Sequence, residues 1–177
     1  MALNQNVFLI GPMGAGKTTI GRMLAESLKY EFLDSDKVIS DRAGADIPWI
    51  FDIEGEEGFR ARESMIIDEL SQLSETVLAT GGGAVLREDN RKWLRSRGMV
   101  VYLETSIRQQ LFRTEKDRGR PLLLSGDRKK TLTDLMDMRG PLYEQNADLI
   151  VSTDQLSPKA ITQKIIEYME TREWEVS

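Results

Sequence analysis

The segment GPMGAGKT, residues 11–18, has residue types and a spacing that suit the binding of a phosphate chain. It matches the pattern G-x-x-x-x-G-K-[ST] and lies between an expected strand and an expected helix, which is the context that such a loop requires. Its glycines let successive N–H groups converge on phosphate oxygens, and the start of the helix adds partial positive charge. A helix-capping turn alone would not account for the lysine. The sequence therefore predicts that a nucleoside triphosphate binds here.

The polar residues of this loop have separate expected tasks. Lys17 carries a full charge to the β- and γ-phosphates, and Thr18 offers its hydroxyl to Mg²⁺. Thr19 is a candidate for a contact with the α-phosphate. The remaining expected ATP contacts of the loop lie at Gly14, Ala15 and Gly16.

Carboxylates follow a second expected strand, in the segment FLDSD. Asp34 and Asp36 are two residues apart and therefore lie on the same side of an extended chain. One carboxylate can hold a metal-bound water while the other accepts a hydrogen bond from a substrate hydroxyl. Alternatively, Asp36 is only the N-cap of a helix that begins at Lys37. Local sequence does not separate these interpretations, and both can hold.

Three consecutive glycines, Gly81 to Gly83, follow the third expected strand in the segment LATGGGAV. A tight turn needs one or two glycines, whereas three favour the close approach of a ligand to the backbone. Two arginines add to this pattern: Arg60 near the start of a helix, and Arg139 just before Gly140 and Pro141, where a helix is expected to end or kink. Arg60 has a plainer interpretation as a solvated i,i+3 ion pair with Glu63.

Taken together, these groups indicate a particular kind of second substrate. Arg60 and Arg139 recognise an anion, and Asp36 recognises hydroxyls, so the expected acceptor is a small polyol that bears a carboxylate. The segment 115–128, EKDRGRPLLLSGDR, is charged and aperiodic and fits a mobile lid that excludes water. Its Arg120 can then neutralise charge during phosphoryl transfer. A solvated surface loop is the alternative for this segment.

Composition limits the chemistry further. The chain has 177 residues and a net charge of −5, with no cysteine and no histidine. A proton acceptor must therefore be a carboxylate, and a metal should be an oxygen-bound ion such as Mg²⁺. The charge disfavours nucleic acid as a partner. The N-terminal segment MALNQNVFLI lacks a basic region, and no apolar run reaches membrane-spanning length, so we expect a cytoplasmic protein without membrane contact.

Alternating strands and helices must position these groups. The strand candidates are Asn6–Ile10, Glu31–Asp34, Thr76–Thr80, Met99–Leu103 and Asp148–Ser152. Helices are expected after the phosphate loop, from about Gly58 with Phe59, Ile66, Leu70 and Leu73 inward, over Arg87–Arg97 with Gly98 as C-terminal cap, after Ser106, and after Ser157–Pro158. This alternation predicts one α/β domain over residues 1–177, with a parallel sheet between two helical layers.

Other nucleotide-binding classes fit less well. The guanine-reading N-K-x-D and T-K-x-D motifs of GTPases are absent, and the third strand ends in ATGGG instead of the acidic end typical of motor ATPases. A small kinase for a second small substrate remains. A catalytically silent nucleotide-binding module is an alternative from another class, and it would bind ATP without turnover.

The chain resembles the shikimate kinase family from about Val7 to Ile166. The motifs that carry this resemblance are GPMGAGKTTIGRMLA, FLDSD, GEEGFRARE, ATGGGAV, VVYLE, the RPLL of the lid and RGPLY, in that order. The resemblance implies the fold of nucleoside monophosphate kinases, with five parallel strands in the order 2-3-1-4-5, a lid and a monomer. It implies phosphorylation of the 3-hydroxyl of shikimate by ATP with Mg²⁺; a kinase for another small hydroxy-acid, such as gluconate, is the alternative.

The resemblance also implies roles for single residues. Thr18 and Asp34 would govern Mg²⁺, and Asp36 would bind the shikimate hydroxyls and is the candidate base. Arg60 and Arg139 would hold the shikimate carboxylate, with Gly82 against the ring. Arg120 would contact the phosphates from the lid and act in catalysis with Lys17 and Asp36. Arg113 and the loop at Pro158 would enclose the adenine.

Overall fold

A single five-stranded sheet forms the centre of the molecule. The computed structural model describes residues 5–117, 119–123 and 126–176, with side chains as far as Arg172. Its strands are β1 (Asn6–Ile10), β2 (Glu31–Asp34), β3 (Thr76–Ala79), β4 (Gly98–Glu104) and β5 (Leu149–Ser152). They lie in the order β2-β3-β1-β4-β5, and every neighbouring pair is parallel. The expected parallel sheet and its strand order are confirmed.

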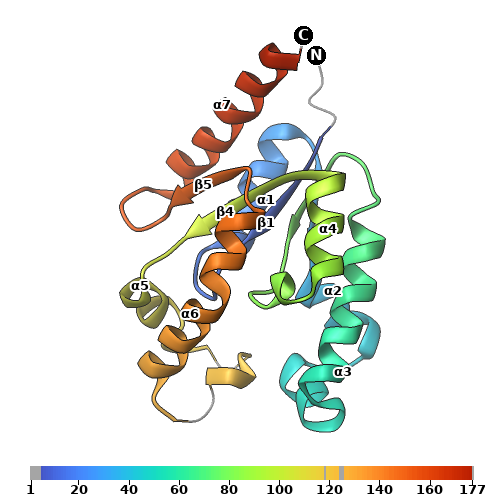
Figure 1. Ribbon diagram of the computed structural model, residues 1–177, viewed down its shortest axis with the longest axis vertical. Helices are drawn as coiled ribbons and strands as arrows, with labels where there is room; N and C mark the ends of the chain where they lie inside the picture. Colours follow the sequence, from blue (N-terminus) through green and yellow to red (C-terminus); the bar gives the residue numbers. More distant parts are fainter. Residues whose placement is uncertain (1–4, 118, 124–125, 177) are drawn as a thin grey trace.

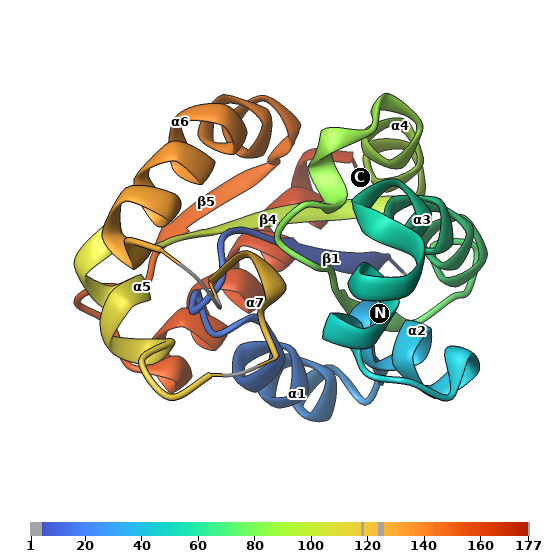
Figure 2. The same cartoon turned by 90° about the horizontal axis from the view of Figure 1, so that it is seen from below.

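Seven helices and two short 3₁₀ turns connect the strands within the described residues. They are α1 (Lys17–Leu28), α2 (Ser35–Ala43), α3 (Ile47–Leu70), η1 (Ala84–Leu86), α4 (Glu88–Arg97), α5 (Ile107–Arg113), η2 (Pro121–Leu123), α6 (Arg128–Asn146) and α7 (Pro158–Val176). Figure 2 shows α3, α4 and α6 on one side of the sheet and α1 and α7 on the other. The three-layer α/β/α arrangement is therefore confirmed.

Strand residues alternate between the two faces of the sheet and so supply two cores. Phe8 and Ile10 of β1 pack with α3, α4 and α6, whereas Val7 and Leu9 pack with α1 and α7. All four side chains are fully buried. Because both faces are covered, the strands read as continuous apolar runs, as the central strands of parallel sheets do.

The structure refines several expectations about local structure. The helix expected from about Gly58 is the second part of α3: it begins just after a kink at Gly55, which has φ 72° and ψ 177°, and an additional first part starts at Ile47. Leu73, expected to face inward, lies beyond the end of that helix and is 42% exposed, so that expectation is wrong. Gly98 is the C-terminal cap of α4 as expected, with an extended φ of −177° because the residue already belongs to β4. Of the end or kink expected at Pro141, the end is wrong, since α6 continues to Asn146 and keeps Tyr143 and Asn146 buried.

The loops at the carboxyl ends of the strands gather at one end of the molecule. The phosphate loop follows β1, Asp34 ends β2 and the three glycines follow β3. Figure 1 shows η2 and the start of α6 at this end, away from the start of β1 and the end of α7. Parallel sheets bind ligands beyond the carboxyl ends of their strands, so a site is expected here.

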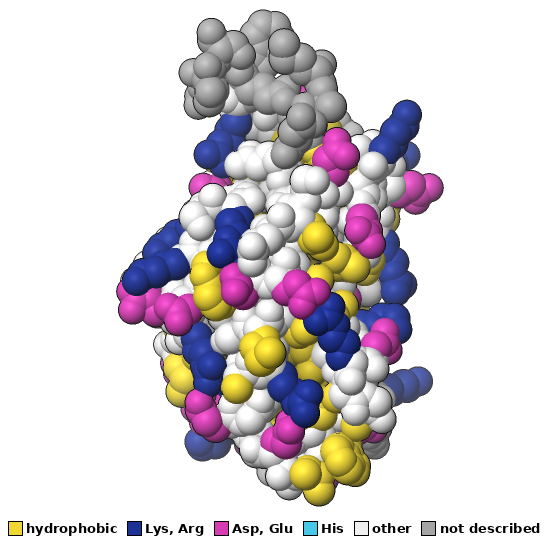
Figure 3. All heavy atoms as spheres, turned by 90° about the vertical axis from the view of Figure 1, so that its right-hand side faces the viewer, with side chains coloured by type: hydrophobic (Ala, Val, Ile, Leu, Met, Phe, Trp, Pro, Cys, Tyr) yellow, Lys and Arg dark blue, Asp and Glu magenta, His cyan; other side chains and the backbone are white. Residues whose placement is uncertain are grey.

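The face over α3 and α4 carries charges of both signs. Figure 3 shows Lys and Arg side chains interspersed with Asp and Glu on this face. Exposed ion pairs such as Arg42–Glu69 and Arg62–Glu54 lie along α2 and α3, and pairs of this kind add little stability. No helix among the described residues has the length and apolar character needed to cross a membrane.

Candidate active site

The phosphate loop turns sharply between β1 and α1. Gly11, Gly14 and Gly16 have φ values of 145°, 77° and 88°, a region that side chains disfavour. Gly11 also passes close to β4, because a Cβ at this position would lie 2.7 Å from the Leu103 carbonyl oxygen. Gly16 is the N-cap of α1 and has no side chain to cap it, so the first N–H groups of the helix face the loop.

Lys17 folds back along this loop. Its Nζ donates to the carbonyl oxygens of Gly11, at 2.6 Å, and Pro12, at 2.8 Å. Burial of the ammonium and, as a smaller effect, the nearby Arg120 charge lower the pKa of Lys17 to about 7, while Asp36 and Asp34 oppose the shift. A phosphate anion in the loop would oppose this loss of charge, so the geometry suits phosphate binding.

Thr18 and Asp34 lie together beside the loop. Thr18 Oγ1 donates to Asp34 Oδ2 at 2.9 Å, while Asp34 Oδ1 accepts from the backbone N–H groups of Asp36 and Lys37. Asp34 is thus the N-cap of α2, and the alternative that Asp36 caps this helix is wrong. The reason is the length of β2: the helix starts directly after Asp34, which places Asp36 in the first helical turn with its side chain free for another partner.

A hollow of about 750 Å³ lies over the phosphate loop. It is lined by most of the expected ATP contacts, namely Gly14, Ala15, Gly16, Lys17, Thr18, Thr19, Arg113 and Arg120, together with Asp34 and Asp36. Pro158 is not among its lining residues; it is the exposed first residue of α7. The structure thus brings the expected nucleotide residues together, with Pro158 as the exception.

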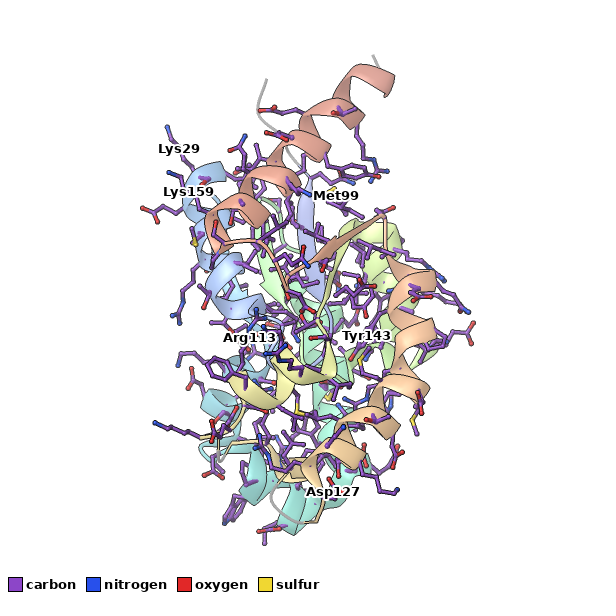
Figure 4. All side chains as sticks on the ribbon, turned by 90° about the vertical axis from the view of Figure 1, so that its left-hand side faces the viewer. Lys29, Met99, Arg113, Asp127, Tyr143 and Lys159 are labelled. Carbon is purple, nitrogen blue, oxygen red and sulfur yellow. The ribbon has the colours of Figure 1, made fainter. Side chains whose placement is uncertain are left out.

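Arg113 forms one wall of this hollow. Its guanidinium donates to the Gly14 carbonyl oxygen at 2.9 Å and to the hydroxyl and carbonyl oxygens of Thr153 at 3.3 Å. Figure 4 shows Arg113 on α5 in the middle of the molecule, on the side of α6 that carries Tyr143. Arg113 therefore links the phosphate loop to the segment between β5 and α7, and this segment ends at Pro158, the first residue of α7.

A second hollow of about 430 Å³ lies between α3, the glycine run and α6. Its polar lining comprises Asp36, Arg60, Glu63, Arg120 and Arg139, and its apolar lining includes Met13, Ile47, Phe51, Phe59 and Leu122. A lining that combines charged groups with aromatic rings suits a small, polar, ring-shaped ligand.

The three glycines leave room for the charged side chains of this second hollow. A Cβ on Gly81 would lie 2.8 Å from both Asp36 Oδ1 and Glu63 Oε2. A Cβ on Gly82 would lie 3.3 Å from Arg139 Nη1, and one on Gly83 would lie 2.5 Å from Arg60 Nη1. None of the three has a positive φ. The glycines therefore leave space for charged groups, with the tightest approach at Gly83 and the loosest at Gly82.

Arg60 and Glu63 form a buried ion pair. Arg60 Nη1 donates to Glu63 Oε1 at 2.9 Å, and the two residues are 8% and 0% exposed. The expectation of a solvated pair is therefore wrong, because the glycine run covers both side chains. Burial raises the pKa of Glu63, while the Arg60 charge opposes the rise.

Glu63 is also a site residue that the sequence reasoning missed. Its signal was present in the segment GEEGFRARE, at i,i+3 from Arg60, but the spacing alone does not report burial.

Several polar atoms of this hollow remain unpaired. The buried atoms without a hydrogen-bond partner among the described residues include Asp36 Oδ1, Arg60 Nε, Glu63 Oε2 and Arg139 Nε. Buried polar groups are usually paired, so these atoms indicate a ligand that completes the site.

Asp36 and Arg120 line both hollows, so the two are adjacent and share a wall. Burial raises the pKa of Asp36, and the nearby Asp34 carboxylate adds to the rise, while Arg120, Lys17 and Arg60 oppose it. Arg120 is held by an ion pair in which its Nε donates to Asp117 Oδ2 at 2.9 Å. The Asp36 carboxylate and the Arg120 guanidinium therefore lie between a ligand bound in one hollow and a ligand bound in the other.

The lid segment 115–128 is more structured than its sequence indicates. It contains η2, and Leu123 is buried against Met13 of the phosphate loop and Leu132 of α6. Positions 118, 124 and 125 within this segment lie outside the described residues. The interpretation as a solvated surface loop does not account for Leu123, whereas a segment that covers the site does.

Comparisons with known proteins agree with this geometry. The family model for shikimate kinase matches residues 13–170. A shikimate kinase of Legionella pneumophila (strain Corby) is 58% identical over 165 residues, which cover 93% of this chain and 94% of the relative. A shikimate kinase of Photobacterium profundum is 54% identical over 172 residues, covering 97% of this chain and 98% of the relative.

Solved structures show the same likeness. The shikimate kinase from Acinetobacter baumannii in complex with shikimate superposes with a TM-score of 0.93 at 48% identity, over 95% of this chain and 94% of that chain. The likeness therefore extends over nearly the whole of both chains. This chain belongs to the shikimate kinase family.

Proposed function

We propose that this chain transfers the γ-phosphoryl group of ATP to the 3-hydroxyl of shikimate and releases shikimate 3-phosphate and ADP. The observation that carries this proposal is the wall shared by two hollows, one over a phosphate loop and one lined by three arginines and two acids. Membership of the shikimate kinase family supports it, as does the relative from Acinetobacter baumannii that was solved with shikimate.

Arg60 and Arg139 hold the shikimate carboxylate in this proposal. Both are buried, at 8% and 4% exposed, and both have an Nε atom without a partner among the described residues. Guanidinium groups pair with carboxylates through two parallel hydrogen bonds, which orient as well as attract. The backbone at Gly82 lies against the ring, and Asp36 accepts hydrogen bonds from the hydroxyls. The carboxylate end and the reacting hydroxyl are thus fixed at opposite ends of the second hollow.

The donor is held by the phosphate loop and by two arginines. The N–H groups of the loop and Lys17 bind the phosphates of ATP, with Thr19 at the α-phosphate. Arg120 reaches the transferring group from the lid, since it lines both hollows. Arg113 and the loop at Pro158 enclose the adenine, because Arg113 already bridges the phosphate loop and Thr153, which precedes that loop.

The residues present fit one Mg²⁺ ion bound together with ATP. Thr18 and Asp34 supply a hydroxyl and a carboxylate 2.9 Å apart, and oxygen ligands suit this ion. Among the described residues there is no group of three or more acidic side chains that would hold a metal alone. Thr18 and Asp34 are therefore the residues that would hold the ion, together with the bound ATP. The ion would supply charge neutralisation at the phosphates.

Catalysis rests on positioning and on charge. The transferring phosphoryl group is only loosely bonded in the transition state, so the protein has little covalent chemistry to perform. Lys17 and Arg120 neutralise the developing negative charge. Asp36 takes the proton of the 3-hydroxyl, and its raised pKa makes it a better proton acceptor than an ordinary aspartate. Closure of the lid, which is formed by residues 115–128, excludes water from the γ-phosphate.

Release of ADP in the presence of different acceptors tests this proposal. The purified protein is incubated with ATP and Mg²⁺ and with shikimate, gluconate or a nucleoside monophosphate in turn. Of these three acceptors, we expect only shikimate to support turnover, because only shikimate has both the ring and the carboxylate that suit the second hollow. Turnover with gluconate would favour the alternative kinase, and ATP binding without acceptor-dependent turnover would favour a silent nucleotide-binding module.

The setting of this activity follows from the same sequence. We infer one domain over residues 1–177, a monomer in the cytoplasm, and small molecules as its substrates, with neither nucleic acid nor a membrane as partner. Light scattering at assay concentrations tests the oligomeric state, and limited proteolysis tests the single domain.

A further inference from the structure

Tyr143 contacts two residues that line the second hollow, Gly82 and Arg139, although it does not line the hollow itself. It lies on α6, is 1% exposed, and its Oη donates to the carbonyl oxygen of Gly82 at 2.5 Å. Its ring stacks on Tyr102 of β4, with a centroid distance of 5.0 Å. Figure 4 shows Tyr143 in the interior, beside the ends of the strands. If Tyr143 were only a core residue, any buried carbonyl oxygen could accept the hydrogen bond from its hydroxyl. The acceptor is instead a carbonyl of the glycine run, which points to a role at the site.

The contact with Gly82 fixes the orientation of the central peptide of the turn that Ala84 N–H closes on the Gly81 carbonyl oxygen at 3.0 Å. Glycine permits more backbone conformations than other residues, and two adjacent glycines permit rotation of the peptide between them. The carbonyl and the N–H of one planar trans peptide point in opposite directions. When Tyr143 holds the Gly82 carbonyl, the N–H of Gly83 points away from α6. The N–H groups of Gly82 and Gly83 have no hydrogen-bond acceptor among the described residues.

Tyr143 also lies beside the arginine expected to bind the acceptor. Arg139 and Tyr143 are four residues apart on α6 and therefore lie on one face of the helix. Burial raises the pKa of Tyr143 to about 12, and the adjacent Arg139 guanidinium opposes the rise. The hydroxyl thus stays protonated at neutral pH and remains a donor. Arg139 and the Tyr143 hydroxyl both lie beside Gly82, since Arg139 Nη1 would be 3.3 Å from a Gly82 Cβ and the hydroxyl donates to the Gly82 carbonyl oxygen.

We propose that Tyr143 is a positioning residue for the acceptor: its hydroxyl holds the Gly82–Gly83 peptide and the neighbouring Arg139 guanidinium in the orientation that binds the shikimate carboxylate. This inference rests on the proposed function and assigns a role beyond it. Tyr143 itself touches neither substrate. Its removal is expected to weaken the binding of the acceptor and to leave the nucleotide site, on the other side of Asp36, unaffected.

Tyr143→Phe tests the proposal, because it removes one oxygen atom and keeps the stacked ring. We expect the shikimate KM to rise by about five- to 20-fold, from the loss of one hydrogen bond and the unpaired Gly82 carbonyl. The ATP KM and kcat are expected to change by less than about twofold, since no contact of the phosphate loop is altered. Titration of shikimate without ATP should show the same loss of affinity.

Tyr102→Phe is the matched control. Tyr102 is the stacking partner, it is as buried as Tyr143, and its hydroxyl makes no hydrogen bond among the described residues. We expect unchanged kinetics for this variant. A shikimate KM for Tyr143→Phe within twofold of wild type, or an equal rise in the ATP KM, would overturn the positioning role. Absence of shikimate-dependent ADP release in the wild-type protein would instead overturn the proposed function.

Discussion

Gly83→Ala isolates the steric claim about the glycine run. Gly83 has φ −95° and ψ 6°, so alanine can adopt its backbone conformation without entering the left-handed region. The added Cβ would lie 2.5 Å from Arg60 Nη1 and in contact with the other guanidinium atoms. Ordinary contacts require about 3.5 Å or more, so the whole guanidinium must withdraw by roughly 1 Å. That movement takes it away from the position in which it binds the acceptor in the proposed function.

The expected loss can be sized from the contacts that Arg60 makes. A charge-assisted hydrogen bond contributes about 1.5–3 kcal/mol, which corresponds to a rise of roughly 10- to 100-fold in the shikimate KM if one arginine is displaced. The ion pair with Glu63 is strained by the same movement, since Nη1 lies 2.9 Å from Glu63 Oε1. We therefore also expect a lower thermal unfolding midpoint. The ATP KM should stay within about twofold of wild type, because Arg60 lies outside the nucleotide hollow.

Gly140→Ala provides the control for this prediction. Gly140 is next to Arg139 in the chain and is buried, but a Cβ there would meet only Met136 Cε, at an ordinary 3.8 Å. It lies within α6, where replacement of glycine by alanine favours the helix by about 1 kcal/mol. Its shikimate KM should be unchanged. A folded Gly83→Ala enzyme with a wild-type shikimate KM would refute the argument that each glycine makes room for a charged group of the site.

Three further predictions concern the charges of the site. Lys17→Ala and Arg120→Ala should each lower kcat by about 100-fold or more in the ADP-release assay, because the proposed role of both is to neutralise charge in the transition state; a kcat near wild type would remove that residue from catalysis. Arg139→Ala should raise the shikimate KM by about 10- to 100-fold with a smaller change in kcat, and an unchanged KM would refute its assignment. Burial lowers the pKa of Lys17 to about 7, so at pH 8 the Lys17 amine of the free enzyme is mostly neutral. Binding of ATP favours the charged ammonium and should therefore be accompanied by the uptake of about one proton. Affinity for ATP should then fall as pH rises from about 7 to about 9, as calorimetry in two buffers of different ionisation enthalpy would measure; binding without proton uptake would contradict this.

The sheet and most of its helices could be predicted because the signals are local. The three central strands, β1, β3 and β4, are mainly apolar runs of four to seven residues that are covered on both faces. The differences fall where one residue has two possible roles. Gly98 follows a helix and precedes a strand, and β4 extends to include it. Either Asp34 or Asp36 could cap α2, and the point at which β2 ends decides for Asp34.

The burial of site residues could not be predicted from spacing. Arg60 and Glu63 stand at i,i+3 on α3, an arrangement that usually lies in solvent. What buries them is the glycine run after β3, about 20 residues later in the chain. The same applies to the three glycines. Their number favours the close approach of a ligand to the backbone, and the structure shows that charged side chains of the protein also lie close to them, namely Asp36, Glu63, Arg139 and Arg60. Contacts between distant segments decide both cases.

A crystal structure of the enzyme with ADP, Mg²⁺ and shikimate tests most directly whether donor and acceptor meet across Asp36 and Arg120. We predict the shikimate carboxylate between Arg60 and Arg139, and the 3-hydroxyl within hydrogen-bond distance of Asp36 and facing the β-phosphate of ADP. Shikimate bound with its carboxylate away from both arginines, or with its 3-hydroxyl turned away from the nucleotide, would contradict this arrangement.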